Sequence, residues 1–104
     1  MTDWQLERAA GEAMGLKLEG EEGRDAFLWT NDEHGTIWVP LSSDDQAMKL
    51  AKRFHLHIDQ RPGQQISVQS PDFAHMVCYE AKKGQALDLN RAIVECAARM
   101  VPRA

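Results

Sequence analysis

Cysteine is scarce in this chain of 104 residues, and long apolar runs are missing altogether. Cys78 and Cys96 are too few for a disulfide framework and do not form a Cys-x-x-Cys pair, so both are expected to be reduced, as in a cytosolic protein. No apolar run approaches the roughly 20 residues of a membrane span. The first residues, 1–4, lack the basic and apolar regions of a secretory signal peptide. The sequence therefore predicts a cytoplasmic protein without a membrane partner.

Several sequence signatures of catalysis and ligand binding are also missing. The chain has no Gly-x-Gly-x-x-Gly or Gly-Lys-Ser/Thr phosphate loop and no Gly-x-Ser-x-Gly nucleophile elbow. Nor does it have the excess of basic residues typical of nucleic-acid modules, because its net charge is −4. We therefore predict no cofactor and no catalytic residue, and we do not expect direct nucleic-acid binding.

The size and composition indicate one globular domain spanning residues 1–104. A chain of this length buries roughly 65 % of its unfolded surface, which is enough for one core without disulfides. The charge is unevenly distributed: residues 1–48 hold eleven acidic and three basic residues, whereas residues 49–104 hold five acidic and nine basic ones. This asymmetry is either ordinary scatter over solvated surfaces or a polarised surface that steers a charged partner.

Three amphipathic helices are indicated by capping residues followed by apolar residues at helical spacing. Thr2 with Gln5 fits a capping box at the start of the chain, and Ser43 with Gln46 fits a second one. The second helix is expected from about Asp44 to Phe54. Asp88 is the expected N-cap of the last helix, whose apolar stripe comprises Leu89, Ala92, Ile93, Cys96, Ala97 and Met100.

Six short strands are expected between these helices, at residues 16–19, 26–29, 36–39, 56–59, 66–68 and 76–79. The strands are joined mostly by short turns, which favours antiparallel pairing. We therefore predict an α+β (α/β) domain, an α/β/α sandwich with three helices and one mostly antiparallel sheet of five or six strands. The predicted order is α-βββ-α-βββ-α.

The hairpin that contains Phe27, Trp29 and Trp38 is apolar on both of its faces. A sheet with one face in water normally alternates apolar and polar residues. Either helices cover both faces of this hairpin, or one face is an interaction surface, and tryptophan is common in both settings. We consider Phe27, Trp29 and Trp38 a candidate interface for a protein partner or for a second copy in a homodimer.

Histidines form the alternative site. His55 and His57 alternate with apolar residues and are expected on one strand face, where His34 or His75 would complete a metal-ligand set. The competing interpretation is that they are polar strand residues that face water. We expect no bound transition metal.

One stretch resembles a known family. Residues 38–51 match the pattern W-x-P-L-x-x-x-x-x-A-x-x-L-A of the phage ABA sandwich domain family, and residues 91–98 are similar to its closing helix. The resemblance covers roughly residues 1–60 and 88–101, and residues 62–85 show none. It implies an α/β/α sandwich of unassigned function in phage or prophage genomes, and it carries over no catalytic residue. Six residues in the two matching stretches are expected to mark the fold and are called the fold markers: Trp38, Pro40, Leu41, Ala47, Leu50 and Ile93.

Three functions remain open. The first is a non-catalytic interaction module of phage or prophage type that acts on a protein partner. The second is a small-molecule or metal-dependent enzyme that uses the histidines. The third is an accessory protein linked to DNA or RNA. A flat apolar patch over the hairpin favours the first, a deep polar pocket around His55 and His57 the second, and a continuous basic stripe the third.

Overall fold

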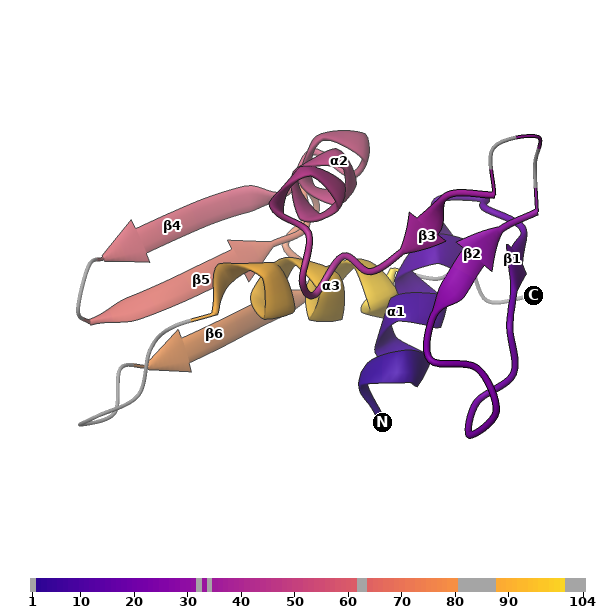
Figure 1. Ribbon diagram of the computed structural model, residues 1–104. Helices are drawn as coiled ribbons and strands as arrows, with labels where there is room; N and C mark the ends of the chain where they lie inside the picture. Colours follow the sequence, from indigo (N-terminus) through magenta and orange to yellow (C-terminus); the bar gives the residue numbers. More distant parts are fainter. Residues whose placement is uncertain (1, 32, 34, 62–63, 81–87, 101–104) are drawn as a thin grey trace.

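The computed structural model describes residues 2–31, 33, 35–61, 64–80 and 88–100 (Figure 1). Three helices and six strands follow one another in the order α-βββ-α-βββ-α, which confirms the predicted order and the α+β class. The elements are α1 (Asp3–Ala13), β1 (Leu18–Glu19), β2 (Leu28–Thr30), β3 (Ile37–Trp38), α2 (Asp44–Arg53), β4 (His57–Arg61), β5 (Gln65–Gln69), β6 (Met76–Glu80) and α3 (Leu89–Arg99).

The strands form two sheets, where the sequence had predicted one. Strands β1-β2-β3 make an antiparallel sheet, here called the N-terminal sheet, and β4-β5-β6 make a second antiparallel sheet, the C-terminal sheet. The two sheets lie at opposite ends of the molecule with the helices between them (Figure 1). The prediction of a single sheet of five or six strands was therefore wrong.

A glutamine side chain explains why the N-terminal sheet ends at β3. The Gln46 Oε1 atom accepts a hydrogen bond of 2.6 Å from the Val39 N–H, and its Nε2 donates one of 2.6 Å to the Ile37 carbonyl. Gln46 therefore occupies polar groups at the edge of β3 that another strand would need for pairing. Pro40 follows at once, has no N–H to donate, and is fully buried.

The helix ends follow the local sequence signals. Thr2 and Gln5 form the complete capping box, with both reciprocal hydrogen bonds present. Ser43 caps α2 by accepting from the Gln46 N–H, and Asp88 caps α3 by accepting from the Arg91 N–H. The reciprocal half of the second predicted box is not made, because the Gln46 side chain is used at β3 instead. Each such cap contributes about 1 kcal/mol to stability.

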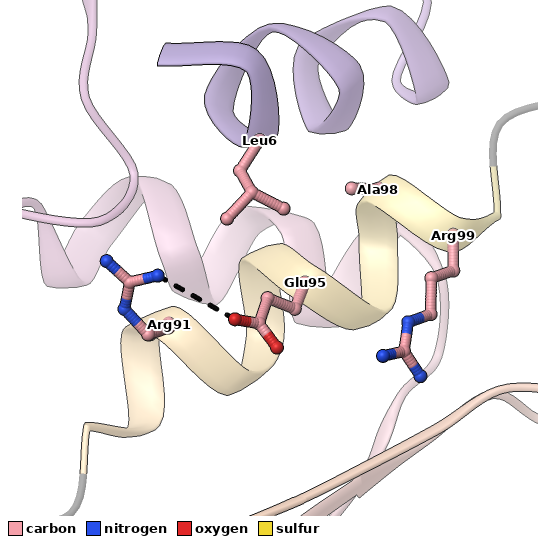
Figure 2. Close-up of a pocket in the computed structure, with 5 residues that line it drawn as sticks. All are labelled: Leu6, Arg91, Glu95, Ala98 and Arg99. Atoms are coloured by element: carbon pink, nitrogen blue, oxygen red, sulfur yellow. Dashed lines mark ion pairs between the residues drawn. The ribbon is translucent and has the colours of Figure 1, made fainter. Parts of the chain in front are cut away.

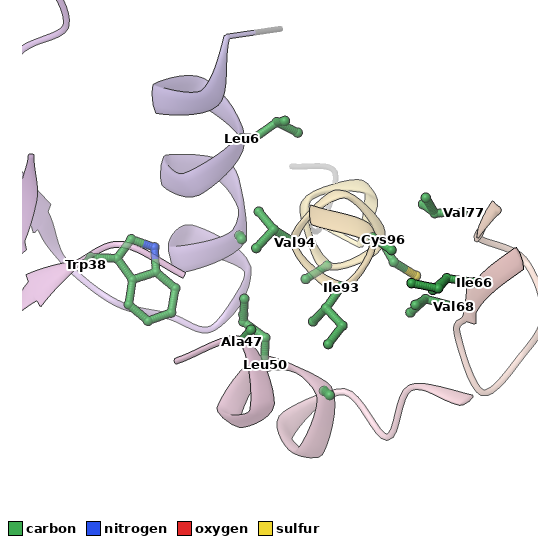
Figure 3. Packing of buried hydrophobic residues seen from close by; sticks show 14 of the residues in the cluster. Leu6, Trp38, Ala47, Leu50, Ile66, Val68, Val77, Ile93, Val94 and Cys96 are labelled. Atoms are coloured by element: carbon green, nitrogen blue, oxygen red, sulfur yellow. The ribbon is translucent and has the colours of Figure 1, made fainter. Parts of the chain in front are cut away.

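Helix α3 runs through the centre of the hydrophobic core and packs against α1, α2, β5 and β6 (Figure 3). Its predicted stripe is buried, with Ala92, Ile93, Cys96 and Ala97 fully inaccessible to solvent and Leu89 and Met100 half-buried. Val94 lies outside that stripe and is also fully buried. The reason is that α1 packs against a second side of α3, and Leu6 of α1 and Val94 belong to the same core cluster (Figure 3).

The fold markers lie in or against this core. Five of the six, all but Leu41, are at most 4% exposed, and Leu41 is half-buried against the core cluster. Both cysteines are free, as predicted; Cys78 is exposed and Cys96 is buried. Within the described part of the chain, no helix combines the length and the apolar character needed to cross a membrane.

Candidate functional site: an exposed apolar face of the N-terminal sheet

Three large apolar side chains are exposed on the N-terminal sheet and in the bend that leads into it. Trp29 on β2 is 38% exposed and lies directly opposite Ile37 on β3, which is 51% exposed. Phe27 precedes β2 by one residue, is two positions from Trp29, and is 53% exposed. Phe27 lies in the bend that leads into β2, so it stands next to this pair in the chain and outside the paired strands. We call Phe27, Trp29 and Ile37 the apolar face.

The opposite side of the same strands is buried. Leu28 and Trp38 are register partners, and their exposed fractions are 2% and 4%. The two-residue alternation of a strand therefore explains why neighbouring aromatic residues have opposite environments. Of the two apolar faces of the hairpin, one therefore belongs to the core and the other faces solvent.

Trp38 does not belong to the candidate interface, which corrects the sequence-based prediction. Its indole Nε1 donates a hydrogen bond of 2.7 Å to the Glu7 carbonyl of α1. The ring also lies against Gly11 of the same helix, where a Cβ atom would come within 2.9 Å of Nε1. Trp38 thus fixes the N-terminal sheet to α1.

Glu7 strengthens this connection from the same helix. Its carboxylate Oε2 accepts a hydrogen bond of 3.3 Å from the Leu41 N–H, just beyond β3. Partial burial raises the pKa of Glu7 above its ordinary value, although the bond from Leu41 acts in the opposite direction. One helical residue therefore holds two points of the 38–41 segment, through its backbone and through its side chain.

The apolar face is carried by an acidic part of the chain. The described residues between 17 and 38 include five acidic residues and two basic ones; the acidic ones are Glu19, Glu21, Glu22, Asp25 and Glu33. Glu19 on β1 is the register partner of Trp29 and accepts a hydrogen bond of 2.9 Å from Asn31 Nδ2. A carboxylate thus borders the tryptophan directly.

The histidines are not arranged as predicted. His55 has a φ of 52° and follows the C-cap of α2, so it lies outside β4. His57 is the first residue of β4, and its ring stacks on Phe73 with centroids 5.6 Å apart. The expectation that both histidines share a strand face was wrong, because the α2 helix ends in a left-handed residue before the strand begins.

The sequence had also indicated His34 or His75 as a third metal ligand. His75 is half-buried in the turn before β6, and His34 lies outside the described residues. Among the residues that the structure places, no group of three or more His, Cys, Asp or Glu side chains is arranged to hold a metal ion.

A groove of about 410 Å³ lies between α1 and α3 (Figure 2). Its lining residues are Leu6, Arg91, Glu95, Ala98 and Arg99. Arg91 is 2.6 Å from Asp3 Oδ1 and 3.7 Å from Glu95 Oε1, and Arg99 donates to the Met76 carbonyl. The charged groups of this groove are therefore engaged by the protein itself.

Burial disfavours ionisation of two nucleophilic side chains near this groove. Burial, together with the negative charge of Glu95, raises the pKa of the Tyr79 hydroxyl, and burial raises the pKa of the Cys96 thiol. Raised pKa values disfavour the anionic forms that act as bases or nucleophiles. The groove has the character of a packing defect between paired helices.

Sequence reasoning missed one member of the apolar face, Ile37. The signal was present, since Ile37 and Trp38 are adjacent on a strand and must face opposite sides. Comparison of the chain with protein families, curated proteins and solved structures finds no match to any of them. The function is therefore inferred from the exposed surface of the molecule itself.

Proposed function

We propose that this protein is a non-catalytic protein-interaction module whose binding surface is the apolar face of the N-terminal sheet. The proposal rests on the exposure of Trp29 and its register partner Ile37, with the exposed Phe27 two residues before Trp29. Exposed apolar clusters on small domains mark interaction sites more often than scattered single residues do. A few residues carry most of the binding energy at protein interfaces, and tryptophan is enriched among them.

The surroundings indicate the chemistry of the partner. Glu19 borders Trp29, and the segment that carries the apolar face is acidic. The complementary partner is a protein surface with an apolar centre and a basic rim, since opposite charges speed encounter and fix orientation. A symmetric dimer through this face would place two acidic rims against each other, so a heterologous protein partner is preferred to a second copy.

The proposal extends to the biological setting. The W-x-P-L stretch at residues 38–41 and the following helix resemble the phage ABA sandwich domain family, so the partner belongs to a phage, a prophage or its host. Free Cys78 and Cys96 suit a reducing compartment such as the cytoplasm.

The test uses site-specific photo-crosslinking. Benzoylphenylalanine placed at position 27 is expected to crosslink one protein from a lysate of the host. The same group at position 73 is the matched control, because Phe73 is 68% exposed and belongs to the loop before β6. The captured protein is then purified and its affinity measured.

With the purified partner, Trp29→Ser is expected to weaken binding by about 2 kcal/mol or more, roughly thirtyfold. Phe73→Ser should leave the affinity unchanged. Circular dichroism must show that Trp29→Ser is folded. Crosslinking of the same protein in equal yield from positions 27 and 73, or equal affinity of both variants, would sink the proposal. Sedimentation as a dimer that Trp29→Ser dissociates would instead identify a second copy as the occupant.

A further inference from the structure

The C-terminal sheet has an uncovered edge at the opposite end of the molecule. Strand β4 pairs with β5 only, and all five of its residues are exposed. Within the described part of the chain, no strand pairs with its other edge. An edge strand presents a row of backbone N–H and C=O groups that another extended chain can pair with.

Beside this edge lies a groove of about 550 Å³ between the C-terminal part of α2 and β4. Its lining residues are Met48, Ala51, Lys52, His55, Leu56, His57 and Ile58. The pairing of β4, β5 and β6 explains why this groove is open. Ile58, Val68 and Val77 lie side by side on the same face of the sheet. Helix α3 covers Val68 and Val77, which are 0% and 4% exposed, whereas Ile58 is 36% exposed.

The groove is thus an apolar strip that the helices leave uncovered. Met48 on α2 is 39% exposed and forms the other side of the strip. A fourth strand added to β4 would place every second side chain on this face, over Ile58 and toward Met48. The strip therefore suits a chain in which apolar residues recur at every second position.

The surroundings of the groove are basic. Lys49, Lys52 and Arg53 on α2 are exposed, and none of them makes an ion pair with the described residues. The lining contains no acidic residue. The nearest carboxylate along β4, that of Asp59, has Arg61 at 4.0 Å. These unpaired cations favour a partner with negative charge.

We propose that β4 and this groove form a second binding site, which takes an acidic peptide in extended conformation as a fourth strand of the C-terminal sheet. Backbone hydrogen bonds to β4 supply the affinity. Of the peptide side chains that face α2, apolar ones cover Ile58 and Met48 and acidic ones lie near Lys52. Symmetric pairing of two copies in full register fits less well, because Asp59 would oppose Asp59 and the two basic helices would face each other.

The test uses fluorescein-labelled eight-residue peptides in which the four side chains on one face of the strand are two Val or Ile and two Asp or Glu, with Ser or Thr at the positions between them. A matched set carries Lys at every acidic position. Two further sets are N-methylated at alternate amides, one at the odd positions and one at the even positions. Only one of these two sets removes the N–H groups that face β4, so N-methylation separates strand addition from other modes of binding.

The acidic set is expected to bind at micromolar concentrations and the lysine set about tenfold more weakly or not at all. One N-methylated set should lose binding and the other should keep it. Lys52→Glu should weaken binding by about tenfold. The control Lys17→Glu makes the same charge change beside the N-terminal sheet and should change binding by less than about twofold. Amide resonances of residues 57–61 should shift on titration.

Three results would overturn the proposal. One is that no acidic peptide binds more tightly than its lysine counterpart at concentrations up to about 1 mM. Another is that both N-methylated sets bind equally well. The third is that the resonances of β4 shift with protein concentration alone, which would identify a second copy at this edge. Because Trp29→Ser should leave peptide binding intact, failure here is distinguishable from failure of the proposed function.

Discussion

Replacing Ile93 with alanine tests the central role of α3. Ile93 is 0% exposed and lies on the helix that packs against α1, α2, β5 and β6. The substitution removes three carbons, which at about 0.8 kcal/mol each amounts to about 2.4 kcal/mol of lost burial. The cavity left behind adds to this loss, and the better helix propensity of alanine returns a few tenths of a kcal/mol. We expect a net loss of about 3 kcal/mol.

Urea unfolding followed by far-ultraviolet circular dichroism measures this loss. A domain of this size has about 5–15 kcal/mol of stability, so the variant stays folded and its transition remains measurable. The slope with urea should be unchanged, and the midpoint of thermal unfolding should fall by about 12–24 °C.

The matched control is Ile37→Ala, the same chemical change at a residue that is 51% exposed. It should cost about 1 kcal/mol or less, because half of the side chain already contacts water. A loss below about 1 kcal/mol for Ile93→Ala, or equal losses for the two variants, would refute the placement of α3 at the centre of the core.

Three further predictions follow from the packing and the titrating groups. Gly11→Ala should destabilise the fold by about 1 kcal/mol despite the better helix propensity of alanine, because its Cβ would lie 2.9 Å from the Trp38 Nε1; a gain in the urea midpoint would contradict this contact. Burial raises the pKa of Glu7 in the folded state, so stability is present below the unfolded pKa and decreases as pH rises through the folded pKa; Glu7→Gln should lack this decrease in urea midpoints measured from pH 4 to 7, and parallel profiles would refute it. A thiol reagent should find two thiols per denatured chain and only Cys78 in the native protein, since Cys96 is buried; rapid native reaction of both would show that Cys96 is accessible.

The sequence alone determined the helices and their starting points. Thr2, Ser43 and Asp88 each accept a hydrogen bond from an N–H three residues later. Such contacts join residues three apart, so a few consecutive residues of the sequence are enough to predict them. The period of the apolar stripe on α3 was equally readable, because it depends only on the pitch of the helix.

The alternation along β2 and β3 also predicted that the hairpin has two apolar faces. It left open which of them is buried. The two-residue alternation of a strand assigns residues to two faces but does not indicate which face packs against the core. Contact with α1 decided this, through the hydrogen bond from Trp38 to Glu7 and the close approach at Gly11. Trp38 became core, and Trp29 remained at the surface for the same reason.

Only the tertiary structure decided how many sheets form and what their edges are free to do. Gln46 terminates the N-terminal sheet by bonding to Ile37 and Val39, although its sequence context favoured a capping role. Helix α3 covers two strands of the C-terminal sheet and stops short of Ile58 on β4. Each of these outcomes depends on contacts between different elements or on how far a helix extends across a sheet. Local patterns hold no information on either, because they describe a segment before its neighbours in space are known.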